Sequence, residues 1–375
     1  MSKKSKLANF YNQFSLIILN LLLFIILLNI ICLIVFGIIR KEKNPLNKYN
    51  VEFNLVYPDL TKDQLSQLMN ETYGHGVVFD SFTQFKERPR NGKYVNVEKE
   101  GFRRTINQGP WPPSKKYYNI FLFGGSTTFG YGLPDYETIA SYLQQLISKH
   151  LNMDSKVYNF GRGYYYSTQE RILFEELLSS GIIPNCVIFI DGLNDSGYKI
   201  GELQFKDLLS SFLSNPHSFA LKYLFEELPI IKATTKVANL FINIPIKANI
   251  NLDYINNIIR RYTLNKNIID GLCIKYNIKS IFVWQPIPMY KYDMNYHLFV
   301  NNHLVNHPSK YVYPYMKKYI ENAPLGNNFL WCADFQEKVK KPLYVDIVHY
   351  SSFMSEMFSK EIIKIIEDKE LLLKK

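Results

Sequence analysis

The chain has 375 residues, of which 47% are hydrophobic, so it is long enough for one large domain with additional segments or for two small domains. The formal net charge of +11 is spread thinly and lacks the clustered basic stripe of a nucleic-acid-binding surface, so we expect no nucleic-acid partner. This basic excess suits a position near an anionic lipid surface or acidic polymers, and it equally fits a basic protein with neither partner.

An apolar run near the N-terminus predicts a membrane anchor. Leu16 to Ile39 contains no charged residue, and Asn20 and Asn29 are its only strongly polar residues. At about 1.5 Å per residue the run crosses the ~30 Å hydrocarbon core of a bilayer. A secretory signal peptide has a shorter apolar region and a small-residue cleavage site. We therefore predict a basic tail over residues 1–15 and a retained transmembrane helix over 16–39, with basic residues on both sides that leave its orientation open.

Residues 40–115 are predicted to form a connector with some structure of its own. The stretch QGPWPPSKK favours turns and extended backbone, and TKDQLSQLMNETYG favours a short helix.

From residue 116 onward, strands and helices alternate with short connections. This pattern is typical of a parallel sheet covered by helices on both faces, so we predict an α/β fold, a three-layer α/β/α sandwich with a parallel central sheet. Ser167 and Glu170 have the spacing of a helix capping box. The first expected strands lie at 117–125, 156–161 and 186–195, and the helices between them at 135–151 and 167–181.

The regularity is interrupted at residues 198–252, which are apolar, favour helix and contain three prolines, so we expect a helical insertion there. After it, we predict a helix over 254–277, strands over 280–288 and 329–335, and a long C-terminal amphipathic helix. The complete α/β domain is expected to span 116–370.

Three of the expected strands end in polar, glycine-rich segments: GGSTT, NFGRG and DGLND. Ligands of open α/β sheets bind outside the carboxyl ends of the strands, so these segments are the candidate site. GGSTT lacks the lysine of a phosphate-binding loop and the glycine spacing of a dinucleotide motif. Ser126 within it is therefore a candidate nucleophile, although a Gly-Gly-Ser turn also occurs for purely structural reasons.

A nucleophilic serine needs a base, and the base needs a group that orients it. Of the seven histidines, His349 is the one with an acidic residue in a suggestive context, because Asp346 precedes it by three residues in DIVH. A DxxH pair alone also fits a solvated loop.

Taken together, four blocks resemble the SGNH hydrolase superfamily, the GDSL-like esterases and lipases. FGGSTT, NFGRGYYYS, DGLND and DIVH occur in the family's order, and the resemblance covers residues 116–368. Gly192, Asn194 and Asp195 match its GxND motif. The family's GDS motif has Asp before the serine, where this chain has Gly125. The resemblance implies an SGNH/flavodoxin-like fold.

The resemblance also implies a mechanism, in which Ser126 attacks an ester carbonyl, His349 transfers the proton and Asp346 orients the imidazole. The Ser126 amide, the Asn194 side chain and an amide of the second block would stabilise the oxyanion. For that last donor Gly161, Gly163 and Tyr164 remain open, and we favour Gly163.

We therefore predict a membrane-anchored serine esterase that acts outside the cytoplasmic membrane on an acyl or acetyl ester, on a glycan or a lipid. Trp284 and Gln285 are candidates for lining its substrate pocket, and core packing explains them equally well. The alternatives are an O-acyltransferase acting on extracellular polysaccharide with the same site and a non-catalytic SGNH-like scaffold. No metal and no organic cofactor are expected, and the four cysteines form no metal-binding or disulfide pattern.

Overall fold

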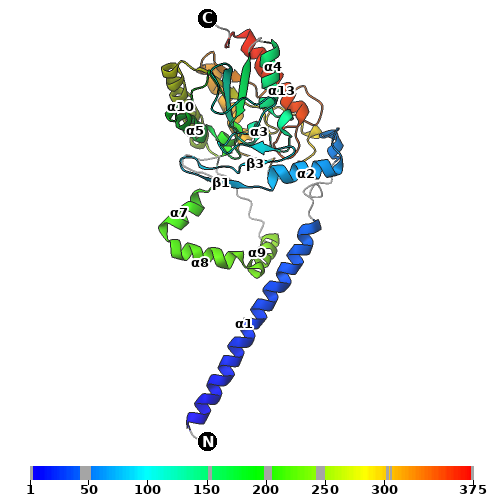
Figure 1. The fold of residues 1–375 in the computed structure, drawn as a ribbon, viewed down its shortest axis with the longest axis vertical. Helices are drawn as coiled ribbons and strands as arrows, with labels where there is room; N and C mark the ends of the chain where they lie inside the picture. Colours follow the sequence, from blue (N-terminus) through cyan, green and yellow to red (C-terminus); the bar gives the residue numbers. More distant parts are fainter. Residues whose placement is uncertain are drawn as a thin grey trace. The chain divides into compact units, whose positions relative to one another are not determined.

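The computed structural model describes residues 3–42, 52–150, 154–197, 205–241, 250–300, 304 and 306–372. These residues form two compact units (Figure 1). The first unit contains 3–42 and 205–241, and the second contains the other described residues.

A five-stranded parallel sheet forms the centre of the second unit, in the order β6–β5–β7–β8–β9. This arrangement between helices confirms the predicted α/β class. Within this sheet, β5 comes first in the sequence and lies between the second strand, β6, and the third strand, β7. The chain therefore adds one strand on one side of β5 and the remaining strands on its other side. In such sheets this switch point is where ligands bind. The strands are β5 (Tyr118–Gly124), β6 (Ser155–Asn159), β7 (Cys186–Asp191), β8 (Lys279–Trp284) and β9 (Phe329–Trp331).

The two faces of the sheet are covered by different helices, because successive strand residues point to opposite sides. Ile120 and Ile188 face a buried hydrophobic cluster that includes residues of α4 (Ile139–His150) and α13 (Ser352–Asp368). Phe123 and Phe189 face the other side, where their rings stack with centroids 4.8 Å apart. The helices on that side are α5 (Ser167–Ser179), α10 (Leu252–Tyr276) and α12 (Ser309–Asn322).

The predicted connector is, from residue 52 on, part of this unit. It contains a 3₁₀ turn (Phe53–Leu55), helix α2 and two small antiparallel sheets, β1–β2 and β3–β4. Its bounds are α2 (Lys62–Tyr73), β1 (Val77–Asp80), β2 (Gln84–Glu87), β3 (Arg90–Asn91) and β4 (Asn96–Val97).

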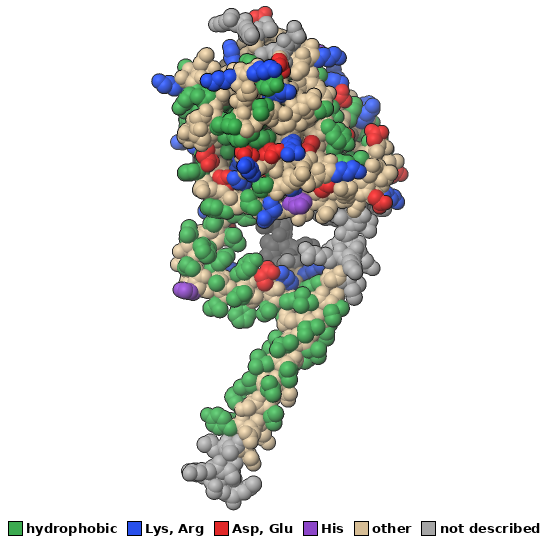
Figure 2. Space-filling model, viewed as in Figure 1, with side chains coloured by type: hydrophobic (Ala, Val, Ile, Leu, Met, Phe, Trp, Pro, Cys, Tyr) green, Lys and Arg blue, Asp and Glu red, His purple; other side chains and the backbone are tan. Residues whose placement is uncertain are grey.

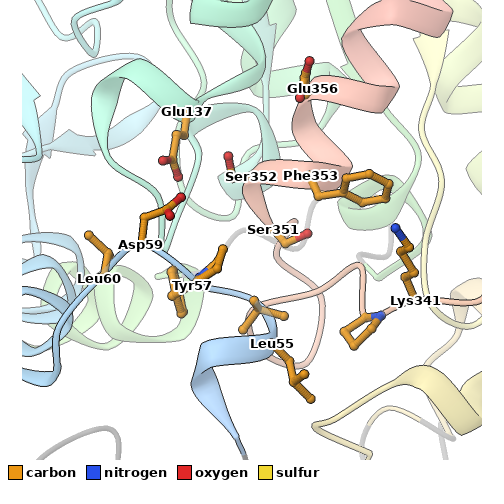
Figure 3. A pocket seen from close by; sticks show the side chains of 13 residues that line it. Leu55, Tyr57, Asp59, Leu60, Glu137, Lys341, Ser351, Ser352, Phe353 and Glu356 are labelled. Carbon is orange, nitrogen blue, oxygen red and sulfur yellow. The ribbon is translucent and has the colours of Figure 1, made fainter.

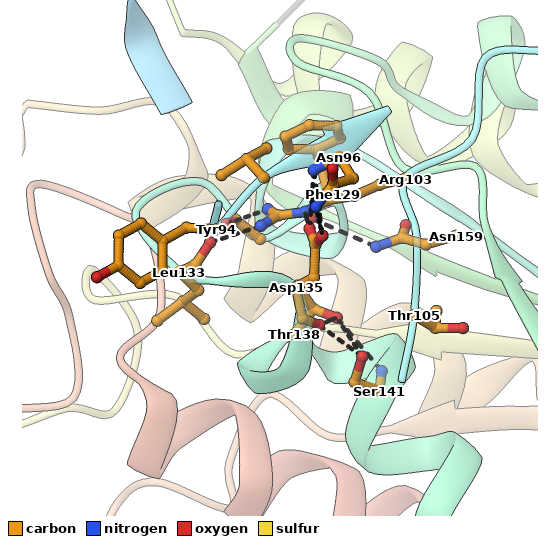
Figure 4. A network of polar contacts seen from close by, with 12 residues as sticks. Tyr94, Asn96, Arg103, Thr105, Phe129, Leu133, Asp135, Thr138, Ser141 and Asn159 are labelled. Atoms are coloured by element: carbon orange, nitrogen blue, oxygen red, sulfur yellow. Dashed lines mark hydrogen bonds and ion pairs between the residues drawn. The ribbon is translucent and has the colours of Figure 1, made fainter. Parts of the chain in front are cut away.

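Arg103 links this N-terminal segment to the loop that follows β5 (Figure 4). Its fully buried guanidinium donates to the carbonyls of Phe129, Gly130 and Leu133 and pairs with Asp135 at 2.8 Å. Several carbonyls that would otherwise be buried without a donor are satisfied in this way, so the loop is held in one conformation.

Helix α5 begins differently from the prediction. Ser167 is its first residue, and the Ser167 hydroxyl donates to Asp195 Oδ1 at 2.5 Å instead of capping the helix. The predicted capping box is therefore wrong, because a buried carboxylate from the neighbouring α6 (Leu193–Gly197) takes the hydroxyl.

The described residues of the first unit form helices and the short connections between them. Helix α1 (Lys3–Glu42) contains the predicted anchor, and the described part of the predicted insertion forms α7 (Lys206–Ser214), α8 (Pro216–Glu227) and α9 (Pro229–Phe241). Among the described residues, the segment Asn9–Gly37 of α1 is the one helix long and apolar enough to cross a membrane.

Candidate active site

The site lies at the switch point of the sheet, where β5 and β7 end side by side. Ser126 follows β5 as the first residue of the short helix α3 (Ser126–Phe129), and Asn194 follows β7 in α6. Glycine is required at this turn, because a Cβ on Gly124 would lie 2.1 Å from Thr128 Oγ1. A Cβ on Gly125 would lie 2.5 Å from Asn194 Nδ2, so the Asp of the GDS motif at this position would require the Asn194 side chain to shift.

Hydrogen bonds link Ser126 to His349 and His349 to Asp346. Ser126 Oγ is 2.8 Å from His349 Nε2, and His349 Nδ1 is 2.7 Å from Asp346 Oδ2. The imidazole therefore connects the hydroxyl to the carboxylate through its two nitrogens. These side chains remain partly accessible to solvent, with 14% of His349 and 22% of Asp346 exposed, so an external molecule can approach the serine.

Hydrogen bonds hold the Asp346 carboxylate in place. Its Oδ1 accepts the backbone amides of Val348 at 3.0 Å and His349 at 2.9 Å. Burial by itself raises the pKa of Asp346, but its attraction to His349 and these hydrogen bonds outweigh burial and lower the pKa below its ordinary value. The carboxylate is therefore ionised and oriented towards the imidazole at neutral pH.

Two tyrosines that the sequence analysis did not single out complete the surroundings of this pair. Tyr73, at the end of α2, donates to Asp346 Oδ2 at 2.9 Å. Tyr131 lies parallel to His349, with ring centroids 5.3 Å apart, and also contacts the ring of Tyr73. Neither residue belongs to a recognisable motif, and Tyr73 lies in the segment that the sequence predicted to be a connector.

The second block is arranged differently from the prediction. The Gly163 amide donates to Glu87 Oε1 at 2.9 Å, so the structure contradicts the choice of Gly163 as a free oxyanion donor. The Gly161 amide is also occupied, by Asn159 Oδ1 at 3.0 Å. Tyr164 has a left-handed backbone with φ of +65°, and its amide has no acceptor among the described residues. Tyr164 is therefore the one of the three alternatives with a free N–H.

Glu87 connects this block to the histidine. Its Oε1 also accepts the Tyr131 hydroxyl at 2.8 Å, and Tyr131 is the residue that stacks on His349. The Glu87 side chain is buried, so it positions the second block and the ring beside the imidazole at the same time.

Asn194 reaches the same place from the other strand. Its Nδ2 donates to the Tyr165 carbonyl at 2.7 Å and lies next to Gly125. An amide nitrogen carries two hydrogens, so one remains for another acceptor. The first amide of α3, that of Ser126, has no acceptor among the described residues either.

Trp284 and Gln285 lie in the core beneath the site and are not exposed to a substrate. Trp284 is fully buried and packs against the rings of Tyr262 and Tyr313. Of the two predicted alternatives, core packing and lining of a substrate pocket, the structure shows core packing. Gln285 is also buried, and its Oε1 accepts the Thr127 hydroxyl at 2.7 Å, which fixes the residue after Ser126 from behind. Both side chains are therefore supporting elements of the sheet edge.

A separate cavity of about 520 Å³ lies between residues 55–60 and the start of α13 (Figure 3). Ser351 and Ser352, just after His349, line it, as do Glu137 and Lys341. Ser126 and His349 do not line this cavity, so it is distinct from the serine–histidine pair. No group of three or more His, Cys, Asp or Glu residues within the described ranges is placed to hold a metal ion.

Comparison with known proteins gives matches among solved structures only, since no protein-family model and no curated protein matches the chain. The chain is similar to a lipolytic protein of the G-D-S-L family from Desulfitobacterium hafniense DCB-2, with 12% identity and a TM-score of 0.37 over 66% of this chain and 99% of that one. It is also similar to the lipase/acylhydrolase from Enterococcus faecalis, with 15% identity and a TM-score of 0.38 over 68% and 98%. A third match is the acetyl xylan esterase AlAXEase, with 13% identity and a TM-score of 0.36 over 66% and 99%. At these identities and TM-scores the functional conclusion rests on the chain's own site.

Proposed function

We propose that the chain is a membrane-anchored serine esterase of the SGNH type. The observation that carries this proposal is the unbroken hydrogen-bonded series from Ser126 Oγ through both His349 nitrogens to the Asp346 carboxylate. A serine hydroxyl is a weak nucleophile at neutral pH, and an adjacent oriented base is what activates it. The position of this series at the switch point of the sheet adds independent support.

In the reaction, His349 Nε2 removes the Ser126 proton while Oγ attacks the carbonyl carbon of the ester. Collapse of the tetrahedral intermediate expels the alcohol, which receives that proton from His349, and leaves an acyl group on Ser126. Water then attacks the acyl-enzyme with His349 again as the base, which releases the acid and restores the serine. Asp346 remains ionised and holds the imidazole throughout.

The negative oxygen of the intermediate requires donors directed at one point. We assign this role to the amides of Ser126 and Tyr164 and to the second hydrogen of Asn194 Nδ2. This assignment replaces Gly163, whose amide is bonded to Glu87. The free amide and left-handed backbone of Tyr164 support it.

The length and apolar composition of α1 support anchoring of the enzyme in a membrane, and we place the α/β unit on the outer side of the cytoplasmic membrane as part of the proposal. We propose an acyl or acetyl ester on a glycan or lipid as the substrate. The test is hydrolysis of short nitrophenyl esters by the wild-type chain and by Ser126→Ala. Loss of hydrolysis in the variant supports the proposal, and an unchanged rate contradicts it.

A further inference from the structure

One polar side chain in the apolar part of α1, that of Asn29, makes a hydrogen bond through both its oxygen and its nitrogen. Asn29 Oδ1 accepts the backbone amide of Ile230, in the first turn of α9, at 3.2 Å. Asn29 Nδ2 donates to the Ile25 carbonyl of its own helix at 2.9 Å. The other asparagine of the run, Asn20, is exposed and has no partner among the described residues. Asn29 is thus the point at which the insertion is joined to the apolar helix.

The Asn29–Ile230 contact satisfies groups on both helices. A primary amide in hydrocarbon is costly unless its hydrogen bonds are made, and polar side chains between membrane helices form such bonds. Ile230 follows Pro229, the first residue of α9, and amides in the first turn of a helix have no partner within the helix. The bond therefore gives a partner to the Asn29 carbonyl oxygen on α1 and to the Ile230 amide on α9.

The contact lies well inside the apolar segment. Asn29 precedes its end at Gly37 by eight residues, which corresponds to about 12 Å along the helix. At the end of the segment, Lys236 of α9 lies over the Phe36 ring, 5.8 Å from its centroid. The second contact lies further along both helices than the first, so the two helices run in the same direction here. Lys236 is placed where its charged group can reach the membrane–water interface.

The covered surfaces of both helices have helical spacing. Between residues 9 and 37 of α1, the half-buried side chains are Leu28, Asn29, Cys32 and Phe36, all on one face. Ile230 and Ala233 form the corresponding face of α9. A continuous stripe along about two turns indicates packing of α9 along α1 and not a single accidental contact.

Helix α8 carries a stripe of exposed apolar side chains. Leu221, Leu224 and Phe225 lie on one side of α8, with exposed fractions of 58%, 64% and 63%. Lys222 and Glu226 lie on another side and pair at 3.7 Å. Leu221, Leu224 and Phe225 therefore form an exposed apolar stripe beside this ion pair. Figure 2 shows hydrophobic side chains exposed both along α1 and along these helices.

We propose that residues 205–241 form a membrane-embedded element, in which α9 enters the apolar layer beside α1 and the apolar stripe of α8 rests in lipid. The occupant is the bilayer, because α8 contacts α9 and α9 packs on an apolar helix that requires a hydrocarbon environment. This inference rests on the anchoring of α1 in the proposed function. It makes the membrane part of the protein a packed group of helices in place of one isolated helix.

The experiment uses the full-length chain reconstituted in phosphatidylcholine–phosphatidylglycerol vesicles, in a Cys32→Ser background. One variant carries an environment-sensitive fluorophore at Leu224→Cys, and its matched control carries the same fluorophore at Lys222→Cys in the same helix. We expect quenching of the Leu224 label by spin-labelled lipid with little quenching by aqueous iodide, and the reverse at position 222. Equal, strong iodide quenching at both positions overturns the inference.

A second measurement addresses α9. Hydrogen exchange of residues 230–236 is compared in the wild-type chain, Asn29→Ala and Asn20→Ala in the same vesicles. We expect exchange about tenfold or more faster in Asn29→Ala only, because a lost bond of about 1.4 kcal/mol corresponds to that factor. Unchanged exchange overturns the α1–α9 pairing. Resistance of the chain to carbonate extraction reports α1 anchoring separately, so failure of the anchor is distinguishable from failure of the embedded insertion.

Discussion

Tyr73 donates a hydrogen bond to Asp346 Oδ2 at 2.9 Å, although 273 residues separate them along the chain. Burial, followed by the negative charge of Asp346, raises the pKa of Tyr73 well above its ordinary value, so the hydroxyl remains a donor across the physiological range. The N-terminal segment thus holds the carboxylate that orients His349, and the proposed active site depends on residues outside the four motif blocks.

Removal of this donor is expected to slow the reaction while substrate binding is retained. In Tyr73→Phe, Asp346 keeps His349 and the two backbone amides but loses one hydrogen bond, for which a typical contribution is about 0.5–1.5 kcal/mol. We expect kcat to fall about 3- to 10-fold with an unchanged KM. Steady-state kinetics with a nitrophenyl ester measures both.

Tyr57→Phe is the matched control for that variant. Tyr57 is more deeply buried than Tyr73, and its hydroxyl donates to the Gly132 carbonyl at 2.8 Å and not to Asp346. We expect a loss of unfolding free energy at least as large as in Tyr73→Phe, with no change in kcat. Equal loss of kcat in both variants would show that Tyr73 acts only through stability.

Glu87 is expected to position the second block. Glu87→Ala leaves the Gly163 amide and the Tyr131 hydroxyl without their acceptor, and each buried unpaired group costs about 1–3 kcal/mol. We expect lower thermal stability and a kcat reduced by more than tenfold. Glu87→Gln retains a carbonyl oxygen at the same place and is expected to recover most of the kcat. A glutamine variant as slow as the alanine variant contradicts a positioning role that depends on this acceptor.

Two of the proposed oxyanion donors differ in kind, because Asn194 donates from its side chain and Tyr164 donates from its backbone amide. Asn194→Ala is expected to lower kcat by about 10²–10³, the usual effect of losing one such donor. Tyr164→Gly keeps the amide and favours the observed left-handed backbone, so kcat is expected to stay near the wild-type value. Kinetics of the two variants decides the assignment, which fails if the glycine variant loses as much activity as Asn194→Ala.

His297 predicts a pH dependence of stability. Burial lowers its pKa from 6.5 to about 4, and its ring is held by the Ile347 carbonyl at Nε2 and by the Phe299 amide at Nδ1. Between pH 6.5 and 4 the unfolded chain binds a proton here that the folded chain does not. The stabilisation that the neutral His297 side chain contributes to the free energy of unfolding is therefore complete above pH 6.5. It decreases as the pH falls, by roughly 3 kcal/mol in total.

His297→Gln carries no titratable group at this position, so its unfolding free energy is expected to vary less between pH 6.5 and 4 than that of the wild-type chain. Urea denaturation at several pH values measures the two slopes. Parallel slopes would show that His297 does not cause this loss of stability.

The sequence was sufficient to predict the sheet and the meeting of Ser126 with His349 and Asp346. Alternating strands and helices bring the ends of β5 and β7 to one edge, and short motifs mark the polar residues there. The donor in the second block could not be predicted, because Glu87 occupies the Gly163 amide from a strand 76 residues away.

The roles of Trp284 and of the N-terminal segment could not be predicted from local sequence patterns either, because they depend on contacts between residues far apart in the sequence. Whether a tryptophan after a strand faces a pocket or the core depends on which helices cover it, here α10 and α12. Likewise, the turn-rich sequence of residues 52–115 does not reveal that Tyr73 and Glu87 contact the site. Such contacts arise only from tertiary packing.

The most direct measurement is labelling of the full-length chain by a fluorophosphonate probe, with the adduct located by peptide mass spectrometry. We predict one adduct on Ser126, formed at least 10³-fold more slowly in His349→Ala because the hydroxyl then lacks its base. Absence of an adduct on Ser126 in the folded wild-type chain, or equally fast labelling in His349→Ala, would contradict a nucleophilic serine activated by this histidine.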